Sequence, residues 1–128
     1  MRNSRHPSPR SFRDLIVWQK SVDLAVSCYE VANGPPMTER FELARQLRRA
    51  SISIAANIAE GAGRKHAGDY ARFLSIARGS QAEVETLLEI IRRLGFVAAQ
   101  SLEAATGLAG EVGRMLTVML GRRSEPKT

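Results

Sequence analysis

The sequence predicts an all-α protein, an up-down-up-down antiparallel four-helix bundle, and three observations support this prediction. Four stretches repeat apolar residues at steps of three and four, the spacing of a helix that buries one face. The strongest helix breakers in the chain separate these stretches. No stretch alternates like a strand, and 128 residues, 44% of them hydrophobic, suit one domain with its own core.

The expected domain is a bundle over residues 11–121. A disordered basic N-terminal tail is expected at 1–10, and a basic C-terminal tail at 122–128. The four helices are expected over about 12–33, 38–62, 69–94 and 101–120.

Start and stop signals bound the first predicted helix. Ser11 and Asp14 have the spacing of a capping box, in which each side chain satisfies a free backbone N–H. The Asn33-Gly34-Pro35-Pro36 stretch ends the helix, because Gly accepts a left-handed cap and proline cannot continue a helix. The predicted core-facing seam is Leu15, Trp18, Val22, Ala25, Tyr29 and Ala32.

The second predicted helix is apolar on two opposite faces. Its core-facing seam is Leu43, Leu47, Ala50, Ile54 and Ile58. At about 100° per residue, an opposite stripe consists of Ile52, Ala56, Ala59 and Gly63. A polar line lies between the two apolar faces and consists of Arg49, Ser53, Asn57, Glu60 and Arg64. A helix with two apolar faces needs two partners, so the second stripe predicts a subunit contact or very close helix packing.

Glycines mark the third and fourth predicted helices. The third has the seam Tyr70, Phe73, Ala77, Val84, Leu87 or Leu88, and Ile91. Gly79-Ser80 lies in its middle, where Gly costs about 1 kcal/mol relative to Ala, so we expect close backbone approach there. The fourth has the seam Leu102, Ala105, Ala109, Val112, Leu116 and Met119. Its three glycines, Gly107, Gly110 and Gly113, permit tight packing or make a helix that depends on its neighbours.

The net charge of +6 comes from the two ends of the chain, +4 from residues 1–13 and +2 from residues 122–128. Residues 1–13 carry four arginines and no acid, whereas 14–121 carry twelve basic and twelve acidic residues. Within that neutral part, 40–78 is locally basic, which favours contact with nucleic acid. The candidate phosphate contacts are Arg40, Arg45, Arg48, Arg49, Arg64, Lys65 and Arg72. The seven aromatic residues fall in seams or at helix ends and leave no exposed row for base stacking, so any contact is expected to be to phosphates.

Candidate chemistry is sparse. Cys28 and the two histidines, His6 and His66, cannot form a tetrahedral zinc site within one chain. Cys28 is expected to pack in the core and His66 to be a solvated loop residue. We therefore expect no enzymatic activity, no cofactor and no metal.

Two features of the second helix have competing interpretations. Asn57 and Glu60 could form an acid site, or a structural or subunit-interface network with the arginines one turn away, and the network is favoured. The run 61–64 (GAGR) has the composition of a phosphate loop. It ends a helix, however, and no strand precedes it, so a helix C-cap is the better interpretation.

We expect a cytoplasmic protein without a membrane partner. No apolar run approaches the roughly 20 residues that a membrane span requires. The basic N-terminus lacks the apolar stretch of a signal peptide.

Several motifs carry a resemblance to a known family. They are 12–19 (FRDLIVWQ), 46–50 (QLRRA) followed by Ser53 and Ile54, 57–64 (NIAEGAGR), and 73–80 (FLSIARGS) followed by Glu83 and Glu85. Over about residues 12–96 the chain resembles the bacterial four-helix bundle proteins named for intervening sequences of 23S rRNA genes. It departs from their pattern at Glu42, where the family usually has a small residue, and at Gln81, where it usually has Leu.

The resemblance implies a cytosolic, nonenzymatic bundle that assembles as a ring-like homopentamer. A related group, the accessory proteins of diversity-generating retroelements, consists of basic pentameric bundles that bind nucleic acid and a reverse transcriptase. The residues that match the family motif are Asn57, Glu60, Gly61, Arg64, Gly79 and Ser80, and their implied role is packing and assembly. With Ile52, Ala56 and Ala59 they form the candidate oligomer interface.

The leading functional hypothesis is a nonenzymatic homo-oligomer, a pentamer, that binds RNA or DNA through phosphate contacts or acts as an accessory to a nucleic-acid enzyme. The alternative is a purely structural cytosolic assembly with no nucleic-acid role.

Overall fold

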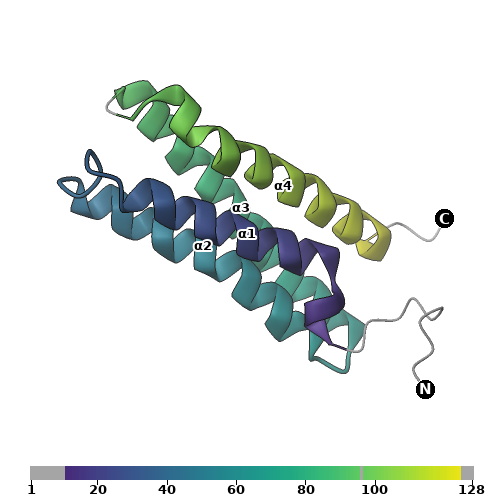
Figure 1. The fold of residues 1–128 in the computed structure, drawn as a ribbon. Helices are drawn as coiled ribbons and strands as arrows, with labels where there is room; N and C mark the ends of the chain where they lie inside the picture. The colour runs from purple at the N-terminus through teal and green to yellow at the C-terminus, as the bar shows by residue number, and fades with distance from the viewer. Residues whose placement is uncertain (1–10, 96, 125–128) are drawn as a thin grey trace, which may run out of the picture.

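The computed structural model describes residues 11–95 and 97–124, which form four α-helices around one core and contain no strand. The helices are α1 (Ile16–Ala32), α2 (Phe41–Ala62), α3 (Ala67–Leu94) and α4 (Glu103–Ser124). Short 3-10 helices, η1 (Phe12–Asp14) and η2 (Ala99–Leu102), precede α1 and α4. Consecutive helices run antiparallel, and α4 packs on α1 as well as on α3, which closes the bundle (Figure 1). The predicted four-helix fold is confirmed.

The two ends of the bundle carry different segments. The turn end carries residues 63–66, which join α2 to α3, together with the start of α1 and the end of α4 (Figure 1). The loop end carries residues 33–40, Gly95 and residues 97–102. The expected N-terminal tail at 1–10 lies outside the described residues. Of the expected C-terminal tail, residues 122–124 continue α4, and 125–128 lie outside the described residues.

Helix boundaries differ from the expected ones where turns compete with the helices. The Ser11 hydroxyl accepts a hydrogen bond from the Arg13 N–H at 3.1 Å, so Ser11 caps η1, and α1 begins only at Ile16. The connection before α2 forms a turn that buries Met37, which delays the start of α2 to Phe41. The left-handed glycine is not Gly34. It is Gly95, at φ 78°, which ends α3.

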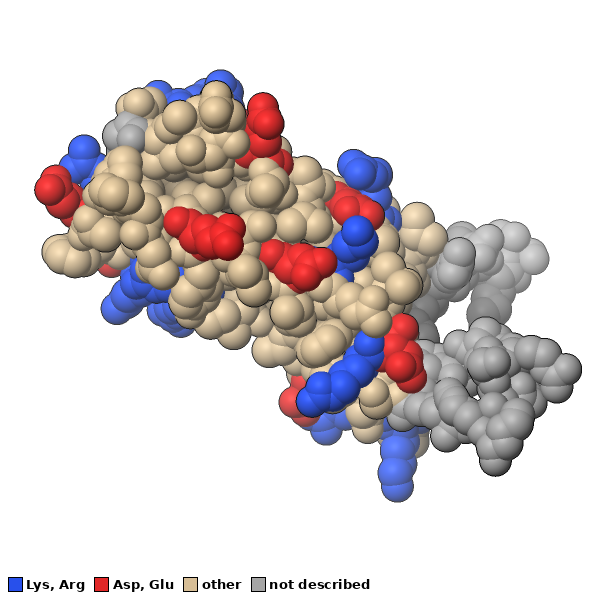
Figure 2. All heavy atoms as spheres, viewed as in Figure 1, with Lys and Arg blue, Asp and Glu red and all other residues tan. Residues whose placement is uncertain are grey.

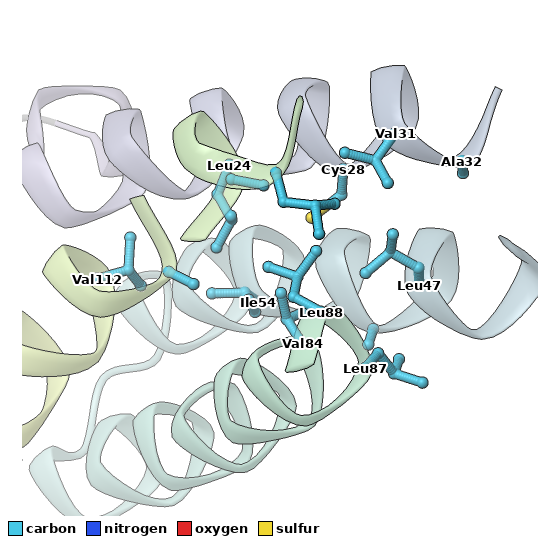
Figure 3. Packing of buried hydrophobic residues seen from close by; sticks show 14 of the residues in the cluster. Leu24, Cys28, Val31, Ala32, Leu47, Ile54, Val84, Leu87, Leu88 and Val112 are labelled. Carbon is cyan, nitrogen blue, oxygen red and sulfur yellow. The ribbon is translucent and has the colours of Figure 1, made fainter. Parts of the chain in front are cut away.

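The core seams of α2 and α4 agree with the sequence prediction, whereas the seam of α1 is rotated. In α2, Leu47, Ala50, Ile54 and Ile58 are buried. The predicted fourth seam is buried at Leu102, the last residue of η2, and in α4 from Ala105 to Leu116. The buried face of α1 consists of Val17, Ser21, Leu24, Cys28, Val31 and Ala32. The predicted Tyr29 is instead exposed. Figure 3 shows Leu24 and Cys28 directed toward the other helices, which confirms the expected core position of Cys28.

Ser21 accounts for the difference between the predicted and the observed buried face of α1. Its hydroxyl donates to the Val17 carbonyl oxygen at 2.7 Å within the same helix. Because that bond satisfies the hydroxyl locally, a polar residue can occupy a fully buried position. A seam read from apolar residues alone skips Ser21 and follows the neighbouring stripe.

The contact between α3 and α4 is built around a buried amide. Gln81 donates from Nε2 to the Ala109 carbonyl oxygen at 2.7 Å, and its Oε1 accepts from Arg78 Nη1 at 2.7 Å. A Cβ atom at Gly113 would lie 2.5 Å from Gln81 Nε2, so Gly113 provides the space for the amide. Gly107 has no atom within 4 Å of such a Cβ. Tight packing therefore accounts for Gly113 alone among the three glycines that the sequence singled out.

Candidate functional site

The matched family motif lies along the contact between α2 and α3, and Gly61 is its point of closest approach. A Cβ atom at Gly61 would lie 2.8 Å from Phe73 Cβ and 3.0 Å from Tyr70 Cδ1. Gly61 therefore has a packing role inside the chain. The following Gly63 is the C-cap of α2, so run 61–64 ends a helix as expected and does not form a phosphate loop.

A polar bridge joins α2 and α3 near the middle of their contact. The hydroxyls of Ser53 and Ser80 lie 2.8 Å apart. Asn57 Nδ2 donates to the Ser53 carbonyl oxygen at 2.8 Å and to Ser53 Oγ at 3.0 Å. The structure thus brings Asn57 and Ser80 together through Ser53, a residue outside the predicted interface set although the family motif includes it.

The polar bridge opens into a cleft of about 350 Å³. The cleft is lined by Glu42, Gln46, Arg49, Ala50, Ser53, Ser80 and Glu83. Within the described residues, no buried side-chain polar atom lacks a hydrogen-bond partner. The hydrogen bond between the Ser53 and Ser80 hydroxyls therefore links the two helices, and the buried polar atoms beside it are satisfied within the protein.

Glu60 is engaged in an ion pair. Its Oε2 lies 2.6 Å from Arg64 Nη2, one helical turn further along α2, and both side chains are exposed. Of the two interpretations of Asn57 and Glu60, this geometry corresponds to the network, because Asn57 bonds to the polar bridge and Glu60 to Arg64. Exposed ion pairs of this kind contribute about 0.5 kcal/mol or less to stability.

The outward stripe of α2 is uncovered. Ile52 is 47% exposed, Ala56 is exposed and Ala59 is half-buried. On α3, an added Cβ at Gly79 would meet no atom within 4 Å. The close backbone approach expected at Gly79 is therefore not found among residues 11–95 and 97–124, and Gly79 faces open space beside Ser80.

The seven candidate phosphate contacts do not form one patch. Helix α2 spans 22 residues, or about 33 Å at 1.5 Å per residue. Arg40 and Arg45 therefore lie toward the loop end, whereas Arg64, Lys65 and Arg72 lie at the turn end. Between them, the Arg48 guanidinium lies 6.0 Å from the centroid of the Tyr29 ring, and Arg49 lines the cleft. Figure 2 shows both signs of charge interspersed on the visible face.

Basic residues at the loop end of α3 are paired within the chain. Glu89 Oε2 lies 2.6 Å from Arg92 Nη2 and 2.7 Å from Arg93 Nε. Hydrogen bonds from Arg92 and Arg93 lower the pKa of Glu89 to about 2, so the carboxylate stays charged at neutral pH. This pairing neutralises part of the positive charge at the loop end.

Two further candidate side chains, Phe41 and His66, lie on the surface. Phe41 is 80% exposed at the start of α2, a helix end, as the sequence places it. His66 is exposed at the N-cap of α3. Over residues 11–95 and 97–124, no group of three His, Cys, Asp or Glu side chains is placed to hold a metal ion. None of the described helices has the length and apolar character needed to cross a bilayer.

Comparisons with known proteins place the chain. A comparison with curated proteins finds no match. Among solved structures, the chain is similar to a protein of unknown function from the S23 ribosomal protein family of Bacteroides thetaiotaomicron. The TM-score is 0.74 at 23% identity, and the match covers 82% of this chain and 98% of the other, which shows a shared fold. The family model described as 23S rRNA-intervening sequence protein matches residues 13–118, and the chain therefore belongs to this family.

Proposed function

We propose that the protein is a nonenzymatic homo-oligomer, a pentamer, that binds nucleic acid through phosphate contacts or serves as an accessory to a nucleic-acid enzyme. The assembly uses the outward side of α2 and α3. The observation that carries the proposal is that Ile52 and Ala56 on α2 and Gly79 on α3 are all left uncovered by the described residues.

The physical argument rests on what this surface costs an isolated protomer. A glycine inside a helix costs about 1 kcal/mol relative to alanine, and no contact within the chain offsets that cost at Gly79. Ile52 leaves apolar area in water that burial would stabilise. Small residues beside one exposed isoleucine allow the backbone of a second copy to approach closely. The pentamer follows from the family resemblance, and a ring joins each copy through two different faces.

Light scattering tests the assembly. The expected mass is that of about five protomers of 14.1 kDa each. Ala56→Arg should produce monomers, because burying an unpaired charge in a contact costs about 3–5 kcal/mol. Ala104→Arg is the matched control, since it adds the same charge at an exposed position of α4 and should leave the mass unchanged. A monomer at micromolar concentration for the unaltered chain would overturn the proposal.

A binding titration with labelled duplex DNA or RNA tests the nucleic-acid part. At about 50 mM salt, phosphate contacts bind strongly, and raising the salt should weaken binding with a linear log–log dependence. The absence of binding under these conditions would instead support the purely structural assembly. An affinity that does not change with salt concentration would contradict binding through phosphate contacts.

A further inference from the structure

Two arginines at the turn end stack on one phenylalanine. The guanidinium carbon of Arg64 lies 4.9 Å from the centroid of the Phe73 ring, and that of Arg72 lies 4.6 Å from it. Phe73 is itself held at the closest approach of α2 and α3, against the backbone of Gly61. This packing fixes where the Phe73 side chain leaves α3, and both guanidiniums lie over its ring.

Stacking on a ring leaves the edge of a guanidinium free to donate. A guanidinium carries five N–H donors in a planar fork, which matches the oxygens of a phosphate. Arg64 uses Nη2 for Glu60. Arg72 has no hydrogen bond or ion pair with any residue in 11–95 or 97–124, so its donors point to no protein acceptor. Lys65 adds an exposed ammonium in the turn between them.

A third arginine at the same end of the bundle, Arg13, also lies over aromatic rings. The Arg13 guanidinium carbon lies 5.2 Å from the Phe12 ring centroid and 6.0 Å from that of Trp18. Its short helix η1 packs on α2 as well as on α1. The turn end therefore gathers oriented cations from three segments of the chain.

We infer that the turn end is the surface that contacts the phosphodiester backbone of nucleic acid, with Arg13, Arg64, Lys65 and Arg72 as the contacts and Phe73 as a positioning residue. This inference rests on the proposed nucleic-acid binding and assigns that binding to one end of the bundle. The stacked guanidiniums occupy the Phe73 ring surface that a base would need, so this end binds phosphates and does not stack bases. At the loop end, Arg92 and Arg93 are paired with Glu89 instead.

Matched double variants of the full chain test the location. Lys65→Gln with Arg72→Gln removes two charges at the turn end, and Arg40→Gln with Arg45→Gln removes two at the loop end. Binding to a labelled 20-base-pair duplex is measured between about 50 and 200 mM salt, a range over which phosphate contacts lose affinity steeply.

The turn-end pair should flatten the log–log salt slope by about 1.8 per copy in contact, and weaken binding at least about tenfold, because each lost contact removes about 0.9 from the slope. The loop-end pair should change the affinity less than about twofold. Equal losses from the two pairs would overturn the turn-end site and leave the proposed function standing. An unaltered protein that binds no duplex would overturn both.

Variants of Phe73 test the positioning role with the charge unchanged. Phe73→Leu removes the ring and should weaken duplex binding about threefold to tenfold, whereas Phe73→Tyr keeps the ring and should restore it. Circular dichroism melting identifies a variant that fails to fold, in which case the Lys65 and Arg72 pair still decides the question. Displacement of the duplex by millimolar inorganic phosphate would show a site for free phosphate and overturn the assignment to a backbone.

Discussion

The two apolar faces of α2 carry similar side chains in opposite surroundings. On the inward face, Leu47, Ile54 and Ile58 are fully buried, and Gly61 is pressed against Phe73. On the outward face, Ile52 is half-exposed and Ala56 is exposed. Ile52 and Ile54 are two residues apart, yet Ile54 is buried in the core of the protomer and Ile52 is not. The difference separates the residues that fold the protomer from those available for assembly.

The largest expected effect comes from placing a carboxylate on each face. Ile54→Asp should abolish folding, because the lost side-chain burial, about 2–5 kcal/mol, adds to about 3–5 kcal/mol for an unpaired buried charge. Ile52→Asp should leave the protomer's melting temperature nearly unchanged and dissociate the oligomer. Circular dichroism and light scattering measure the two outcomes. Equal destabilisation by the two substitutions in a monomeric background would remove the distinction between the faces.

Alkaline pH should act on the inward face through Cys28. Burial raises the pKa of the Cys28 thiol from its ordinary value of 9.0 to about 12, against a smaller opposing effect of the hydrogen bond with Ser51 of α2. Because the folded pKa is raised, its contribution to stability is complete below pH 9 and is lost as the pH rises from about 9 to 12. The loss should follow about 1.4 kcal/mol per pH unit and reach about 4 kcal/mol.

The Cys28→Ala variant is the control for this pH dependence. Tyrosine and lysine also titrate above pH 9, so the informative quantity is the difference between the two proteins. Urea unfolding at pH 8 and pH 10.5 should show the unaltered chain losing about 2 kcal/mol more than Cys28→Ala, since the thiol contributes about 1.4 kcal/mol per unit. Parallel losses would mean that the thiol is accessible in the folded state.

The sequence predicts most of the bundle, because apolar periodicity records which face of a long helix meets a core. It predicts the buried α4 residues from Ala105 to Leu116 and, in α2, Leu47, Ala50, Ile54 and Ile58, but not the buried Ala44 and Ser51. It misplaces the buried face of α1 because Ser21 satisfies its hydroxyl inside its own helix, and periodicity cannot recognise a buried polar residue. Gln81 illustrates the same limit, since its burial depends on the Ala109 carbonyl oxygen and on the space at Gly113, both on α4.

The candidate site is predictable in composition and less so in arrangement. The motif marks Asn57 and Ser80, but the hydrogen bonds that join them run through Ser53, and contacts across helices depend on helix register. The seven basic residues are neighbours along 40–78 and are separated in space because α2 is long and straight. Periodicity assigns Phe73 to a seam. Its position beneath the Arg64 guanidinium depends on the distance between α2 and α3, which a sequence pattern does not give.

An intermediate effect is expected from filling Gly61. In Gly61→Ala the new Cβ would lie 2.8 Å from Phe73 Cβ, an atom that cannot move unless α3 moves. Overpacking of this kind costs about 1–3 kcal/mol, and the better helix propensity of alanine returns up to about 1 kcal/mol. A net loss of about 1–2 kcal/mol is expected in urea unfolding. A gain in stability would show that α2 and α3 separate without cost.

The smallest expected effect comes from filling Gly79. It distinguishes a glycine needed for packing within the protomer, such as Gly61, from one needed for contact between protomers. Gly79→Ala adds a methyl group where no atom lies within 4 Å, so the protomer should gain about 0.5–1 kcal/mol from helix propensity alone. This gain should be measured in the monomeric Ile52→Asp background, where assembly does not contribute to the unfolding free energy. In the oligomer, the same methyl group should weaken association, because it would occupy space reserved for a second copy. Opposite signs in the two measurements would locate the function of Gly79 outside its own chain, and a gain in both would place Gly79 outside the interface.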